Sequence, residues 1–210
     1  MKIINGKCVS LLFILLTVIA SGCSSPKTDV PLEPFPTKTD TPVMTSSATL
    51  LPVEEWDKQV QDVYFTMMVI QMNVMELTAA LNQTIKAGLV FEDYVKLIMP
   101  IEDDCIGVDI QRQQIQPPDS LSSVWNDAID IHMQIYDVTL QTTSGYRLLP
   151  KDGMERVGPL LEKVETLMLT TEGIMDSEYG LNKQELAVRR NNVLQNNMKE
   201  WLQQNGMSAP

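Results

Sequence analysis

The scarcest residue in this 210-residue chain is histidine, which occurs once, at His132. Carboxylate-bridged metal sites in helical bundles need Glu-x-x-His on two helices, and the residue three positions before His132 is Ile129. The Cys-x-x-Cys-His pattern of covalent haem attachment does not occur either. Gly-x-Ser-x-Gly and glycine-rich phosphate-binding motifs are also missing. We therefore predict that the chain is not an enzyme.

Basic residues are also scarce, with 16 Lys and Arg against 27 Asp and Glu and a formal net charge of −11. A protein that binds nucleic acid does so largely by neutralising phosphates with basic side chains. The acidic balance therefore excludes nucleic acid as an expected partner. The same charge repels an anionic membrane surface, so we expect the folded part to stand away from lipid headgroups.

The N-terminus carries the pattern of a secretory signal. Lys2 and Lys7 form a short basic stretch, and residues 9–20 are a nearly unbroken apolar run. A helix that crosses a bilayer needs about 20 apolar residues, and this run is shorter. The segment is therefore predicted to direct export and then to be removed.

The sequence Ile19-Ala20-Ser21-Gly22-Cys23 resembles the lipobox of bacterial prolipoproteins, and this resemblance covers residues 1–23 alone. It implies that residues 1–22 are a signal peptide cut after Gly22 and that Cys23 is the lipidation site. It also implies acyl chains such as palmitate, and an anchored position on the outer face of a cell membrane. Ser24 is typical of sorting to the outer membrane where the host has one. Two or more acyl chains would make the anchor stable.

The predicted processing leaves Cys105 as a lone thiol, because Cys8 leaves with the signal and Cys23 carries lipid. No intramolecular disulfide is then expected. Residues 23–50 are rich in Pro, Thr and Ser and lack an apolar period, which predicts a disordered tether. We expect residues 51–205 to form one folded domain.

Apolar residues in the predicted domain recur at intervals of three and four, which is typical of helices that bury one face. The first seam is the longest, and it runs through Val53, Trp56, Val60, Val63, Met67, Ile70, Val74, Leu77 and Leu81. We predict helices over about 53–88, 91–115, 119–145, 152–180 and 183–204. Short connections favour antiparallel neighbours, so the predicted fold is an all-α, up-down four-helix bundle with an additional C-terminal helix.

One group of side chains could bind a small ligand or a metal. Met68, Met72 and Met75 share one helix face and, with His132, could hold Cu(I) or haem. Methionines at this spacing more often fill gaps between packed helices, and haem would need a second axial ligand that the sequence does not identify. Cys105 falls on an apolar seam, where a buried thiol resists ionisation.

The last predicted helix gathers basic charge in an acidic chain. The residues that give it the character of a helix-in-groove ligand are Arg189, Arg190, Met198, Trp201 and Leu202. They could equally form the solvated face of a bundle helix. We expect a lipid-anchored, non-enzymatic protein that contacts an envelope protein partner. The alternative is a small-ligand or metal-binding lipoprotein that uses the methionine face and His132.

Overall fold

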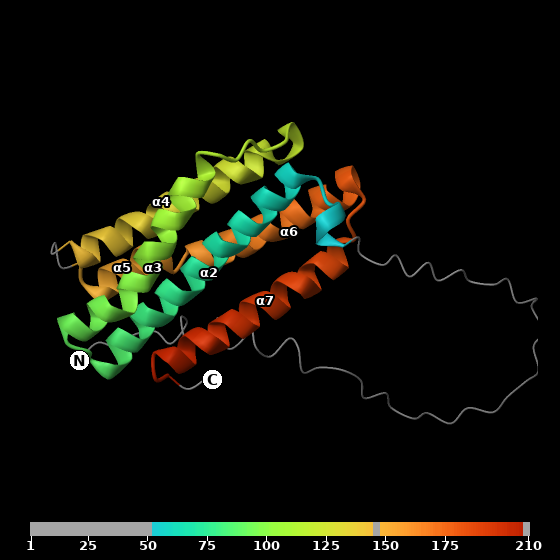
Figure 1. Ribbon diagram of the computed structural model, residues 1–210. Helices are drawn as coiled ribbons and strands as arrows, with labels where there is room; N and C mark the ends of the chain where they lie inside the picture. The colour runs from blue at the N-terminus through green and yellow to red at the C-terminus, as the bar shows by residue number, and fades with distance from the viewer. Residues whose placement is uncertain (1–51, 145–147, 208–210) are drawn as a thin grey trace, which may run out of the picture. The chain divides into compact units, whose positions relative to one another are not determined.

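The computed structural model describes residues 52–144 and 148–207, and these residues form helices and connecting turns without a β-strand. The prediction of an all-α fold is therefore confirmed for this part of the chain. The described residues belong to a compact unit that covers Ser46–Pro210. The predicted signal peptide, Cys23 and the tether up to residue 50 lie outside the described residues (Figure 1).

The central helix of this unit is α2, Lys58–Ala87, which follows a short 3-10 turn, η1, Val53–Glu55. The helix begins later than predicted because the Asp57 side chain accepts the backbone N–H groups of Gln59 and Val60. It ends at Gly88, whose left-handed conformation closes the last turn. All the seam positions except Val53 are buried, as predicted.

Helix α2 is long and apolar enough to cross a membrane by length and composition. The structure buries 78% of its most apolar stretch, because α3, α4, α5, α6 and α7 all pack against it. Figure 1 shows α2 running among the other helices, which is the position of a core helix.

Helices α3, Phe91–Arg112, and α4, Ser122–Thr143, agree with two of the predicted segments. Each is shorter than predicted: α3 ends three residues early, and η2, Asp119–Leu121, takes the first residues expected in α4. These differences lie at helix ends, where the sequence pattern is least informative.

The predicted helix over 152–180 is two helices, α5, Pro150–Val157, and α6, Leu160–Tyr179. The chain breaks at Gly158 and Pro159, because proline cannot continue the hydrogen-bonding pattern of a helix. Gly153 lies inside α5, where a Cβ atom would come within 3.0 Å of the Leu81 side chain. Its missing side chain lets α5 pack closely on α2.

The last helix, α7, spans Lys183–Gln204 as predicted, and it packs against α2 and α6. Gly180 adopts a left-handed conformation, with φ of 67°, and the backbone N–H of Leu181 donates to the carbonyl of Met175. The Asn182 side chain then caps α7 by accepting from Gln184 N and Glu185 N. Three residues thus turn the chain so that α7 folds back on α6.

Candidate functional site: a buried ion pair beneath the last helix

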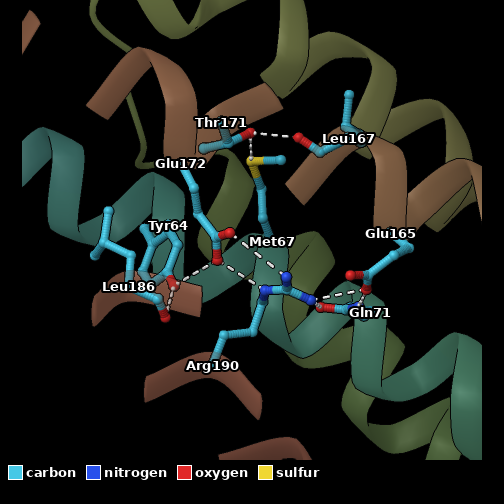
Figure 2. Close-up of polar contacts among 9 residues, drawn as sticks. All are labelled: Tyr64, Met67, Gln71, Glu165, Leu167, Thr171, Glu172, Leu186 and Arg190. Carbon is cyan, nitrogen blue, oxygen red and sulfur yellow. Dashed lines mark hydrogen bonds and ion pairs between the residues drawn. The ribbon is translucent and has the colours of Figure 1, made fainter. Parts of the chain in front are cut away.

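The most unusual side chain in the core is Arg190 of α7, which is 1% exposed. Its Nε atom donates to Glu172 Oε1 at 2.8 Å and its Nη1 atom donates to Glu165 Oε2 at 2.7 Å. Both carboxylates come from α6, and Figure 2 shows them on either side of the guanidinium. Glu172 is as buried as Arg190, whereas Glu165 reaches the surface with 35% of its side chain exposed.

Two side chains of α2 complete the arrangement. Gln71 Nε2 donates to Glu165 Oε2 at 2.6 Å, and Gln71 Oε1 accepts from Arg190 Nη1 at 3.5 Å. The Tyr64 hydroxyl lies 3.2 Å from Glu172 Oε1 and 3.1 Å from the carbonyl oxygen of Leu186, so it can donate to either. We call Tyr64, Gln71, Glu165 and Glu172 the α7 seat, because together they hold the one charged side chain that α7 buries.

The electrostatics of the seat favour a bound guanidinium. Burial by itself lowers the pKa of Arg190, but its hydrogen bonds to Glu172 and Glu165 outweigh burial and raise the pKa above its usual range. Burial and the adjacent charge of Glu172 raise the pKa of Tyr64, so its hydroxyl stays protonated and remains a donor. The seat therefore offers two carboxylates, a phenolic donor and an amide, which is the chemistry that recognises arginine.

The neighbouring arginine makes a different contact. Arg189 lies over the Trp56 ring, 5.7 Å from its centroid. Trp56 in turn stacks on Phe65 at 6.1 Å and meets Tyr64 edge to face at 5.8 Å. Consecutive residues of α7 therefore hold the helix at two points, one aromatic at the partly exposed rim and one ionic in the interior.

The packing of α7 is nevertheless imperfect. Glu185 Oε2 and Trp201 Nε1 are buried without a hydrogen-bond partner, and the remaining such atoms in the described residues are the two ring nitrogens of His132. An unpaired buried polar atom costs about 1 to 3 kcal/mol. Helix α7 also buries few side chains for its length, namely Leu186, Arg190, Leu194 and Trp201. Three of these four buried side chains are apolar, and Arg190 is the charged one.

The five residues predicted to bind a partner all take part in docking α7 within the chain. Arg190 and Trp201 are buried, Arg189 lies on Trp56, and Met198 and Leu202 pack partly buried against the core. Partner binding by these five residues stays a prediction. In this conformation Arg190 is not available to another protein.

The burial of Arg190 could have been predicted from its position on the apolar stripe of α7, although the neighbouring basic residues suggested a solvent-facing charged surface. Leu186, Arg190 and Leu194 follow one another at intervals of four, and Trp201 lies seven residues further on the same face. A charged residue between two leucines on an apolar stripe indicates a buried ion pair. Its partners are far away in the sequence, since Gln71 lies 119 residues before Arg190.

The residues predicted to bind a metal or small ligand lie in α2 and α4. Met68 and Met72 are buried in α2, Met75 is partly buried, and His132 is fully buried in α4. His132 stacks on Tyr136 of its own helix, with ring centroids 6.1 Å apart. Within residues 52–144 and 148–207, no cluster of three or more His, Cys, Asp or Glu side chains could hold a metal ion. Binding through the methionine face stays a prediction.

We expect His132→Leu to stabilise the protein, because both imidazole nitrogens are buried without partners and leucine has a similar volume. Burial lowers the pKa of His132, which also faces Asp109 and Arg112. A lowered pKa means that stability is complete above pH 6.5 and is lost as the pH falls below it. The expected gain in unfolding free energy is about 1 kcal/mol at pH 7 and larger at pH 5. Urea denaturation at both values measures it, and equal gains would contradict the titration of His132.

A second buried polar group lies between α2 and α3. Asn73 Nδ2 donates to Cys105 Sγ at 3.7 Å, and Cys105 is fully buried. Burial, followed by the charge of Asp104, raises the pKa of the thiol to about 12, so Cys105 resists ionisation, as expected for a buried thiol. Glu76, one helical turn from Asn73, is 7% exposed. Burial and Asp104 raise its carboxyl pKa to about 8.

Comparison of the chain with protein-family models, with curated proteins and with solved structures found no match in any of the three.

Proposed function

We propose that this chain is a lipid-anchored protein of the bacterial envelope that acts by contacting another protein, without catalysis. In this proposal α2, α3, α4 and the α5–α6 pair form an antiparallel, up-down four-helix bundle, to which α7 is added as a fifth helix. The lipobox-like sequence that ends at Cys23 and the Pro/Thr/Ser-rich stretch that follows support the anchored position. The anchor places the protein on the extracytoplasmic face of the cell membrane, or of the outer membrane if the host has one.

The observation that carries the proposal is the α7 seat. A buried ion pair contributes less to stability than apolar packing of the same volume, but it fixes which helix is accepted and in which register. Helix α7 is therefore held by Arg190, while its exposed face is mostly polar and also presents Val188 and Val193. A helix of this kind suits a protein whose work is recognition, because it presents one face to the bundle and the other to a partner.

Photo-crosslinking in intact cells tests the contact. A photoreactive residue is placed at Val188 or Val193, which are 60% and 38% exposed on α7, and for comparison at Met133 of α4, which is 43% exposed. We expect a distinct crosslinked envelope protein from the α7 positions and not from α4. Crosslinks that are the same from both helices, or none from α7, would contradict the proposal.

Mass spectrometry of the membrane-extracted chain tests the anchor. The expected mature chain begins at Cys23 and carries a diacylglyceryl group and a further acyl chain. An unmodified thiol at Cys23, or release of the full chain into the medium, would contradict lipid anchoring without bearing on α7.

The alternative is a small-ligand or metal-binding lipoprotein, which the two unpaired nitrogens of His132 favour. Titration of the purified chain with Cu(I) and with haem, followed by absorbance and thermal shift, separates the two functions. Under the contact proposal neither probe changes the spectrum or the melting temperature. A change that His132→Leu abolishes would support the alternative.

A further inference from the structure

We propose that an apolar strip on the outer side of α3 and α4 binds a basic amphipathic helix of another protein. Five large apolar side chains on these two helices are between 40% and 56% exposed. They are Met99, Ile106 and Ile110 of α3 and Met133 and Leu140 of α4, and the half-buried Ile129 accompanies them. We call these six residues the α3–α4 strip. It is a second contact surface, separate from α7, which packs on α2 and α6, and it does not depend on the partner proposed for α7.

The spacing of the strip residues puts them on one side of each helix. In α3, Ile106 and Ile110 follow Met99 by seven and eleven residues. In α4, Met133 and Leu140 follow Ile129 by four and eleven residues. At about 100° per residue, the three side chains of each helix lie within about 40° of one another and away from the centre of its buried stripe. Each helix is therefore apolar on its outer side as well as on the side that packs in the core.

Two contacts between α3 and α4 fix the level of each strip residue. The Tyr94 and Thr142 hydroxyls lie 3.4 Å apart, and Asp109 faces His132. Counted from these two contacts, three pairs of strip residues share a level: Met99 with Leu140, Ile106 with Met133, and Ile110 with Ile129. The strip thus offers an apolar side chain from both helices at each level, over about 17 Å of α3. A two-helix face of this length suits a docked helix of about three turns.

The charges around the strip select a basic partner. Within the described residues, four acidic side chains border the strip and make no ion pair: Glu92, Glu102 and Asp103 of α3 and Asp130 of α4. Helix α4 contains no Lys or Arg. The two basic residues of α3, Lys96 and Arg112, are already paired with Asp93 and Asp109.

A helix with Lys or Arg on both sides of an apolar stripe complements this surface in shape and in charge. Asp103 lies between Met99 and Ile106 on α3, so a basic residue beside the partner's apolar stripe can reach it. A second copy of the chain would instead bring the same acidic side chains together, and an anionic lipid surface would be repelled. The occupant is therefore a basic helix of a different protein.

Binding of a synthetic peptide tests the chemistry of the strip. The probe is a fluorescent helical peptide with leucines on one face and lysines on both flanks, and a matched peptide carries glutamates in place of the lysines. Fluorescence anisotropy with the full chain in detergent measures both, and the lysine peptide should bind at least about tenfold more tightly. Ile106→Ser with Met133→Ser should weaken its binding about tenfold or more, because apolar burial is lost.

The control for these substitutions is Leu169→Ser, because Leu169 is 54% exposed on α6, outside the strip. It should leave binding of the lysine peptide unchanged. Unfolding by urea confirms that each variant is folded before binding is compared. Equal binding of the two peptides, or equal binding by the strip variant and the control variant, would overturn the proposal.

Photo-crosslinking in intact cells tests the occupant. A photoreactive residue is placed at Ile106, and for comparison at Leu169, and mass spectrometry identifies the crosslinked peptide. The peptide from Ile106 should belong to another protein, carry Lys or Arg beside an apolar helical stripe, and disappear when Asp103→Lys is added. Because Met133 also belongs to the strip, its crosslinks should lead to this protein and not to the partner of α7. A crosslink to lipid, to a second copy or to an acidic segment, or none at all, would overturn the strip and leave the crosslinks from α7 unaffected.

Discussion

Arg190→Ala is expected to lower the free energy of unfolding by about 3 to 5 kcal/mol, the largest effect of any single substitution proposed for this protein. The substitution removes the guanidinium that pairs with Glu172 and Glu165 and leaves the buried Glu172 carboxylate uncompensated. The Tyr64 hydroxyl would remain as a donor to Glu172, but a neutral hydroxyl cannot replace a positive charge. Urea denaturation followed by circular dichroism measures the loss.

The adjacent arginine gives the matched control. Arg189→Ala removes the same charge one residue earlier in α7 but breaks a partly exposed contact with the Trp56 ring. We expect a loss of about 0.5 to 1 kcal/mol, the usual size of an exposed cation–π contact. Equal losses at the two positions would mean that net charge, and not the seat, determines the stability of α7.

A double substitution separates the ion pair from the space it fills. Arg190→Met combined with Glu172→Met replaces the buried pair by apolar side chains. Stability within about 1 kcal/mol of the unmodified protein is expected, because apolar replacement removes both buried charges together. If the double variant is as unstable as Arg190→Ala, the contacts of the guanidinium with Glu165 and Gln71 also stabilise the protein, independently of Glu172.

Local signals in the sequence were sufficient to predict several helix ends. Asn182 and Glu185 mark the start of α7, and Gly88 marks the end of α2, because capping depends on residues within one turn. Asp57 moved the start of α2 for the same local reason, although the seam pattern had placed it at Val53. The break between α5 and α6 also has a local signal, Gly158-Pro159. It was not predicted because the apolar stripe continues across it.

The seat could not be predicted from the sequence because it depends on side chains that are far apart along the chain. Gln71 and Glu165 are separated by 94 residues, and their hydrogen bond requires α2, α6 and α7 to meet at one level. Periodicity shows which face of a helix is buried but not which residue of another helix lies opposite. Arg190 was therefore assigned with Arg189 to a basic face, although only its position on the stripe distinguishes the two.

Glu76→Gln is expected to change how stability depends on pH. The folded-state pKa of Glu76 is raised from 4.5 to about 8 by burial and then by Asp104, so the folded protein holds a proton that the unfolded chain releases. Such a group contributes stability that is complete below pH 4.5 and is lost as the pH rises through about 8. Glutamine keeps the neutral shape at every pH and removes this loss.

The gain from Glu76→Gln should therefore grow with pH. Between pH 5 and pH 9 the unfolding free energy of the variant, relative to the unmodified protein, should rise by about 2 to 4 kcal/mol. Denaturation by urea at several pH values measures the difference, and comparison at each pH cancels the opposing effect of His132. Glu155→Gln, on the exposed face of α5, is the control and should show little change. A constant difference across this range would mean that Glu76 is already ionised in the folded protein. A buried negative charge would then lie near Asp104 of α3.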